Sequence, residues 1–235
     1  MSIKFKTIAG SIMFALCVTL LGALSAESAD YFPLSVGNRW VYSPSYGDKG
    51  DRVDSIIGSE TINDTLTYIL NRQEALDDNY NEKRWMFKDS SYVKFCRVWS
   101  NEGIDPAITL NPPLIVIALE PKVGETWKWE MDVGSAHFKA TFLVESVSDS
   151  LTVPAGTFTS CVKVRMLDEV TQNSTTDTNY RRIWFAPNVG PIVYEKYTTN
   201  WSSLTISQKL IDFTVYRDRE KTKTAPGMPL LLLDD

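Results

Sequence analysis

The side chains that most often perform catalysis are scarce in this chain. Acid–base chemistry needs a group that titrates near neutral pH, and histidine is the side chain that does so unperturbed. The sequence has one histidine, His137, at the start of a strand-like run, where a place on the solvated face explains it. No nucleophile-elbow, phosphate-loop or dinucleotide-binding motif occurs in the sequence. We therefore predict no catalytic residue, no cofactor and a protein that is not an enzyme.

Acidic residues are the next group that could perform chemistry. Asp48, Asp51 and Asp54 recur at every third position of a turn-rich segment, but this spacing differs from that of the helix–loop–helix calcium site. Solvated acidic side chains are the better interpretation. A single histidine and two distant cysteines also lack the spacing of a zinc site, so we predict no metal site. Carboxylates for glycoside hydrolysis are paired in space rather than in sequence, which leaves a hydrolase as the least favoured function.

Two cysteines, Cys96 and Cys161, each stand in a strand-like run. In an oxidising compartment they could form a disulfide that crosses the sheet. Two buried free thiols are the alternative, because sequence does not show whether the two α-carbons lie within about 7 Å of each other.

The first 26 residues have the pattern of a secretory signal peptide. Lys4 and Lys6 precede an apolar run at 8–24, and small residues up to Ala26 close the segment. This order predicts a signal peptide at 1–26 that is removed after export, and hence a periplasmic or extracellular protein. An uncleaved membrane anchor is the alternative, although the run is at the lower length limit for spanning a bilayer.

The exported chain is acidic. The formal charge is −5, and loss of the two lysines in residues 1–26 lowers it to −7 because that segment contains no acid. Nucleic-acid binding needs clustered lysine and arginine, so we expect no nucleic-acid partner.

Apolar and polar residues alternate along most of the chain, which is typical of β-strands with one solvated face. In the run 137–147, Phe142 and Val144 fall on one face, whereas Thr141 and Glu145 fall on the other. Strands with one wet face favour an antiparallel sheet. We predict an all-β fold whose antiparallel sheet curls into a half-barrel or barrel. The predicted strands are 39–43, 52–57, 60–62, 66–72, 83–88, 92–99, 114–119, 126–131, 137–147, 160–170, 178–185, 192–199 and 204–216.

Turn residues separate the predicted strands. Asn63-Asp64 and Asp89-Ser90 are typical of tight hairpins. Asn111-Pro112-Pro113 and Val153-Pro154-Ala155-Gly156 indicate larger breaks.

One short pattern occurs twice, at residues 33–42 and 121–129. Each copy has Pro, then Val-Gly, two polar residues, Trp, any residue and an aromatic residue. The glycine allows a positive φ at a turn, and the Trp and the second aromatic residue then share one face of a strand. The repeat suggests two related β-meanders, at 31–115 and 116–220, within a single β domain at 27–220. Residues 221–235 are expected to form a C-terminal tail.

Three stretches, in this order, resemble a group of exported, β-rich bacterial proteins of unknown function. They are residues 31–42, the turn Val153-Pro154-Ala155-Gly156-Thr157-Phe158, and the stretch Trp184-Phe185-Ala186-Pro187-Asn188-Val189-Gly190-Pro191-Ile192-Val193. The group is similar in architecture to the half-barrels of the periplasmic lipoprotein carriers LolA and LolB. Those proteins curl one antiparallel sheet around an apolar cavity that holds acyl chains. The resemblance implies a similar curled sheet and, by fold analogy alone, a lipid ligand.

Aromatic residues are the candidate ligand-binding groups. A curved sheet rich in Trp and Phe would present an apolar concave face to a lipid or other hydrophobic small molecule; the alternative is that these side chains fill a closed core. A second hypothesis is a structural or protein-interaction module of the cell envelope, which contacts an envelope protein through a sheet edge or exposed patch. The predicted ligand-binding residues are Trp40, Tyr42, Trp127, Trp129, Phe142 and Trp184.

Overall fold

The computed structural model describes residues 28–44, 50–74 and 80–216. The predicted signal peptide at 1–26 and the predicted tail at 221–235 lie outside these residues. Two runs of six strands make up the fold, with a short 3₁₀ turn, η1 (Thr199–Trp201), before the last strand. The first run contains β1 (Arg39–Tyr42), β2 (Arg52–Ile62), β3 (Thr65–Glu74), β4 (Tyr80–Lys88), β5 (Tyr92–Ser100) and β6 (Ile104–Ala118). The second run contains β7 (Thr126–Val133), β8 (Ala136–Val153), β9 (Gly156–Gln172), β10 (Thr175–Ala186), β11 (Gly190–Tyr197) and β12 (Leu204–Thr214).

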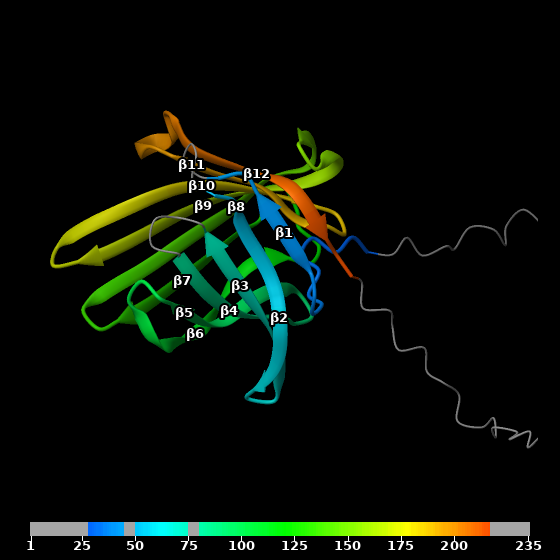
Figure 1. The fold of residues 1–235 in the computed structure, drawn as a ribbon. Helices are drawn as coiled ribbons and strands as arrows, with labels where there is room; N and C mark the ends of the chain where they lie inside the picture. The colour runs from blue at the N-terminus through cyan, green and yellow to red at the C-terminus, as the bar shows by residue number, and fades with distance from the viewer. Residues whose placement is uncertain (1–27, 45–49, 75–79, 217–235) are drawn as a thin grey trace, which may run out of the picture.

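All twelve strands form one antiparallel sheet, as the alternating pattern predicts. Their order in the sheet is β6-β5-β4-β3-β2-β1-β12-β11-β10-β9-β8-β7. Each run is therefore a meander, and the pairing of β1 with β12 joins the two meanders. The sheet curls until its two edge strands, β6 and β7, approach each other (Figure 1). The result is a barrel that is closed except for a seam between β6 and β7, where no backbone ladder joins the strands.

The two copies of the repeated pattern form the same turn at the start of the two meanders. Gly37 and Gly124 both have a positive φ, of 96° and 84°. The Gly37 N–H donates to the carbonyl of Ile56 on the following strand, and the Gly124 N–H donates to the carbonyl of Val144 in the same way, both at 2.9 Å. The N–H groups of Ile56 and Val144 donate back to the residue after each glycine. The shared geometry supports the interpretation of two related meanders.

The structure corrects two of the predicted strand boundaries near glycine and proline. The strands predicted at 52–57 and 60–62 are one strand, β2, because Ile57 forms a bulge and the pairing with β3 resumes at Gly58. The break predicted at Asn111-Pro112-Pro113 is wrong, since β6 runs through it from Ile104. The chain stays extended there with cis peptide bonds before Pro106 and Pro112.

The break predicted at Val153-Pro154-Ala155-Gly156 is also shorter than expected. β8 continues to Val153 and β9 begins at Gly156, so Pro154 and Ala155 alone form the turn. The tight hairpin predicted at Asn63-Asp64 is confirmed, because both residues have a positive φ and connect β2 to β3.

The interior of the barrel is apolar at one end and charged at the other. At the apolar end, Phe32 of the N-terminal segment packs against Trp40 and Phe185, with ring centroids 5.9 and 6.4 Å apart. At the other end the inward positions of β2 carry Arg52 and Asp54, both about 2% exposed. The largest fully buried side chains are Trp40, Tyr42, Phe185, Ile56, Met86, Ile117, Ile192, Leu210, Val93, Val144, Val162 and Val164.

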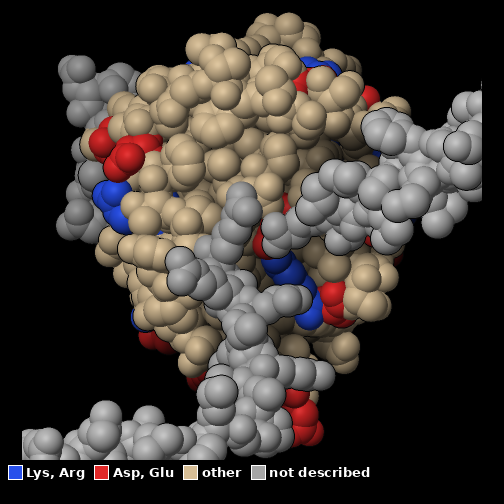
Figure 2. All heavy atoms as spheres, turned by 90° about the vertical axis from the view of Figure 1, so that its right-hand side faces the viewer, with Lys and Arg blue, Asp and Glu red and all other residues tan. Residues whose placement is uncertain are grey.

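The outer surface has no large single-sign patch in the view of Figure 2, where charged side chains are scattered among uncharged ones. In the part of the chain that the structure describes, no helix has the length and apolar character needed to cross a membrane.

Candidate ligand-binding site

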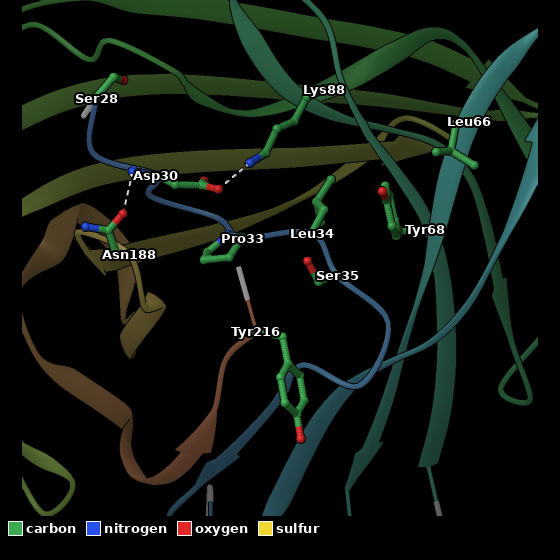
Figure 3. Close-up of a pocket in the computed structure, with 10 residues that line it drawn as sticks. All are labelled: Ser28, Asp30, Pro33, Leu34, Ser35, Leu66, Tyr68, Lys88, Asn188 and Tyr216. Atoms are coloured by element: carbon green, nitrogen blue, oxygen red, sulfur yellow. Dashed lines mark hydrogen bonds and ion pairs between the residues drawn. The ribbon is translucent and has the colours of Figure 1, made fainter. Parts of the chain in front are cut away.

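Three of the cavities lined by described residues are the candidates for a site. One lies beside the N-terminal segment and has a volume of about 360 Å³. Figure 3 shows its residues, with Asp30 and Lys88 pointing toward each other as an ion pair of 2.6 Å. The Asp30 N–H also donates to the side chain of Asn188 at 3.3 Å. These contacts tie the N-terminal segment to the barrel, which favours a structural role for this cavity.

The second cavity, here called the apolar pocket, lies at the seam and has a volume of about 340 Å³. Arg84 is the one charged residue among the described residues that line it. Ligand sites are mostly apolar with a few polar groups that fix orientation, and this cavity fits that description best. The residues that line the apolar pocket are Arg84, Phe95, Val98, Gly103, Ile104, Ile108, Leu110, Leu114, Trp129, Val133 and Phe138.

Two tryptophans of β7 hold the seam beneath this pocket. The indole N–H of Trp127 donates to the carbonyl of Ile115 at 3.0 Å, and that of Trp129 donates to the carbonyl of Pro112 at 2.7 Å. Both acceptors belong to β6, so indole groups make the contacts that a backbone ladder makes elsewhere in the sheet. Side-chain bonds leave room between the two strands that a ladder, with strands about 4.8 Å apart, would remove.

The third cavity, here called the charged chamber, occupies the polar end of the barrel and has a volume of about 360 Å³. Arg84 lines both this chamber and the apolar pocket, so the two cavities meet at its side chain. The residues that line the charged chamber are Arg52, Arg72, Glu74, Tyr80, Glu82, Arg84, Glu102, Arg181, Tyr194, Glu195, Lys196, Ile206 and Gln208.

A buried ion cluster borders the charged chamber. Its members are Arg52, Asp54, Arg72, Glu82 and Arg84. Asp54 accepts from both Arg52 and Arg72: each Nε donates to Oδ1 at 3.0 Å, and each Nη2 donates to Oδ2, at 2.5 and 3.2 Å. Burial alone would raise the pKa of Asp54, but the two guanidinium groups outweigh it and hold that pKa well below its usual range. Asp54 is therefore a permanent anion between two cations.

Glu82 is the second carboxylate of the cluster. It pairs with the Nε of Arg84 and accepts the Tyr80 hydroxyl at 2.6 Å. Burial would raise its pKa, but Arg84 and Arg72 lower it to about 2. Burial, together with the neighbouring carboxylate, raises the pKa of Tyr80 to about 12, so the phenol stays a donor.

Aromatic rings hold one guanidinium of the cluster from the other side. The Cζ atom of Arg52 lies 3.9 Å from the ring centroid of Tyr194 and 4.6 Å from that of Tyr42. The Arg52 Nη1 group also donates to Gln208 at 2.8 Å. Arg52 is thus fixed by a carboxylate, an amide and two rings, which makes it part of the framework.

Only one of the six residues predicted to bind ligand lines a cavity described above. Trp129 lines the apolar pocket, and Trp127 stacks on Phe142 in the core, with ring centroids 5.1 Å apart at an interplanar angle of 9°. Trp40 and Tyr42 are fully buried and donate to backbone carbonyls, Trp40 to Val189 and Tyr42 to Pro191. For Trp40, Tyr42, Trp127 and Phe142, the alternative of a filled core therefore describes the structure.

Trp184 is 7% exposed and belongs to the buried hydrophobic cluster. It pairs in register with Lys163 of β9. Its indole N–H donates to Asp149 at 2.9 Å. Trp184 does not line the apolar pocket, so the structure does not bring it together with Trp129.

The remaining predicted groups are found at separate places. Cys96 on β5 and Cys161 on β9 are both free thiols in the structure, with no disulfide between them. Burial raises the pKa of Cys161 to about 11, which keeps it a thiol. His137 is on a solvated face, where its Nδ1 lies 2.7 Å from Asp132.

The acidic residues of the turn-rich segment divide between two environments. Asp51 is exposed, but Asp54 is buried in the ion cluster, so the interpretation of Asp54 as a solvated acid is wrong. Asp48 lies outside the described residues. In the described part of the chain no group of three or more His, Cys, Asp or Glu side chains is placed to hold a metal ion.

Most of the pocket residues were missed by the sequence reasoning. Ile104, Ile108 and Leu110 line the pocket from the segment between the strands predicted at 92–99 and 114–119, where no strand was predicted. Their even spacing was the available signal, since residues two apart share a strand face. Arg84 and Glu82 also share a face by this rule, but the sequence did not show that the face is buried.

Comparison with known proteins gives little beyond the fold. No family model matches the chain, and no curated protein matches it. Two solved structures are similar. One is named a "putative lipoprotein" from Parabacteroides distasonis ATCC 8503, with a TM-score of 0.49 and 16% identity over 80% of this chain and 100% of that chain. The other is named a "putative exported protein with YmcC-like fold" from Bacteroides fragilis NCTC 9343. Its TM-score is 0.42, with 17% identity over 79% of this chain and 99% of that chain. At these scores neither structure carries an argument about the ligand.

Proposed function

We propose that this chain is an exported, non-enzymatic binding protein that holds a hydrophobic or amphipathic small molecule in the apolar pocket. The observation that supports this most is the pocket itself, a cavity of about 340 Å³ with apolar walls at the seam where no backbone ladder joins the described strands. Apolar surface removed from water contributes roughly 25 cal/mol per Å². The apolar walls of this cavity therefore favour an apolar occupant.

The size of the pocket indicates a ligand with one chain. A methylene group occupies a volume close to that of a liquid water molecule, about 30 Å³. The pocket then holds on the order of ten methylene groups, which is one acyl chain of medium length. The seam offers a lateral route, because a chain can enter between β6 and β7 without breaking a backbone ladder.

Filling the pocket tests the proposal. Ile108 lines the pocket, whereas the next residue, Thr109, is exposed on the opposite face of β6. We expect Ile108→Trp to weaken binding of the apolar fluorophore N-phenyl-1-naphthylamine by at least about tenfold, the effect of losing about 1.4 kcal/mol. Titration of the fluorophore into each folded protein measures the dissociation constant.

Thr109→Trp is the matched control, since it adds the same ring one residue away. We expect its affinity to stay within about twofold of the unaltered protein, which is less than 0.5 kcal/mol. Equal affinities for both variants, or no saturable binding to the unaltered protein, would contradict the proposed site.

A further inference from the structure

The apolar pocket and the charged chamber adjoin, and the residue at their junction is Arg84. We propose that the ligand carries an acidic head group, a carboxylate or a phosphate, and that Arg84 binds this group while the apolar chain lies in the pocket. The inference rests on the proposed function, because it names the chemical class of the ligand of the same site.

The position of Arg84 places a positive charge at the end of the apolar wall. It lies on β4 opposite Val98 of β5, and its Cζ atom is 5.3 Å from the ring centroid of Phe95. Val98 and Phe95 both line the apolar pocket. Arg84 is the one charged residue described in the pocket wall. The polar end of a bound chain therefore lies against its guanidinium group.

Arg84 is also more available than the other arginines of the ion cluster. Arg52 and Arg72 are both bonded to Asp54, and their side chains are 3% and 14% exposed. Arg84 is 27% exposed and pairs with Glu82 through its Nε. Guanidinium groups bind carboxylate and phosphate oxygens through two parallel N–H groups, and the outer nitrogens of Arg84 are suited to this.

Glu82 does not depend on Arg84 alone. It accepts the Tyr80 hydroxyl at 2.6 Å, and the field of Arg72 also lowers its pKa. If Arg84 turns toward a ligand anion, Glu82 keeps these two partners. The exchange therefore avoids the large cost of a buried carboxylate without a partner.

The ion cluster at the junction carries more positive than negative charge. The buried ion cluster has three guanidinium groups and two carboxylates, and its low-dielectric setting strengthens the attraction of the remaining positive charge. Three acids and two bases also line the chamber and balance its total charge, so the positive excess belongs to the cluster beside the pocket. These five residues are Glu74, Glu102, Arg181, Glu195 and Lys196.

Compounds with one chain length and different head groups test the inference. Dodecanoate, dodecyl phosphate and dodecanol share a chain that fits the pocket. Below their micellar concentrations, we expect isothermal titration calorimetry to show both anions binding the unaltered protein about tenfold more tightly than the alcohol, as one charge-assisted hydrogen-bonded pair provides. A preference for dodecanoate would indicate a fatty-acid-like ligand, and a preference for dodecyl phosphate a phospholipid-like one.

Substitution of Arg84 identifies the group responsible. We expect Arg84→Gln to remove the preference for the anions while dodecanol binding stays within about twofold, and Arg84→Lys to keep part of the preference. Arg97 gives a matched control, because it lies on β5 over the ring of Trp85 and outside the pocket, so that Arg97→Gln leaves all three affinities unchanged.

The outcomes separate the two proposals. Equal binding of dodecanol and the two anions to the unaltered protein would overturn the acidic head group and leave the apolar site standing. An anion preference that persists in folded Arg84→Gln would overturn the role of Arg84. The same conclusion would follow if Arg84→Lys kept the full preference while Arg97→Gln weakened it. Failure of all three compounds and of N-phenyl-1-naphthylamine to bind would overturn the proposed function itself.

Discussion

At the scale of single residues, the charged end of the barrel depends on one carboxylate. Asp54 is about 2% exposed and accepts four hydrogen bonds from Arg52 and Arg72. Two buried guanidinium groups would repel each other without it. The stability of this cluster therefore depends on Asp54. In the sequence, Asp54 looks no different from Asp48 and Asp51.

Replacing this carboxylate should destabilise the fold strongly. We expect Asp54→Asn to lower the free energy of unfolding by about 3–5 kcal/mol, because it leaves two buried cations without their anion. Asp51→Asn, three residues away on an exposed position, should change it by less than about 0.5 kcal/mol. Urea denaturation at pH 7 measures both values. Equal, small effects of the two substitutions would show that the buried pairing does not contribute to stability.

At the scale of elements, the seam is held by side chains rather than by a ladder. The indole groups of Trp127 and Trp129 donate to carbonyls of β6, and Trp127 also stacks on Phe142. Elements joined by few backbone bonds open at a lower free energy than the sheet as a whole. The seam is therefore the part of the barrel that we expect to open most readily for a ligand.

Removal of one indole bond tests this local weakness. We expect Trp127→Phe to speed amide hydrogen exchange in β6 and β7 by about five- to 150-fold. The reason is that the substitution leaves the carbonyl of Ile115 unpaired, which costs about 1–3 kcal/mol. Trp40→Phe removes a comparable bond, to the carbonyl of Val189 in the turn between β10 and β11. In that variant the faster exchange should appear at the turn instead. A uniform increase across the sheet in both variants would show that the seam does not open as a separate unit.

At the scale of the whole molecule, local patterns predicted the architecture well. Alternation predicted the strands and the antiparallel sheet, and the glycine pattern at 33–42 and 121–129 predicted that both meanders start with the same turn. Both signals are local, because a strand face repeats every two residues and a positive φ favours glycine at one position. The prolines of β6 misled the prediction, since the chain accommodates them within an extended strand.

The site was predicted less well because its residues are assembled by register. Arg52, Asp54, Arg72, Glu82 and Arg84 belong to three strands, and only the pairing of β2 with β3 and of β3 with β4 places them together. A charged residue at an inward position looks the same in sequence as one at an outward position until the neighbouring strands are known. The same argument applies to Trp184, which is aromatic like the others but is placed by its register away from the apolar pocket.

The described strands form a barrel with a buried ion cluster inside one end. The apolar pocket lies at the seam between β6 and β7, where no backbone ladder joins the strands. We propose that this pocket holds an amphipathic molecule. The measurement that tests it most directly is native mass spectrometry of the mature protein, purified gently from the compartment to which it is exported, followed by organic extraction. We predict that the unaltered protein carries an extractable single-chain molecule with an acidic head group and that Ile108→Trp does not carry it. An unliganded mass for the unaltered protein, or the same bound mass in Ile108→Trp, would contradict the claim.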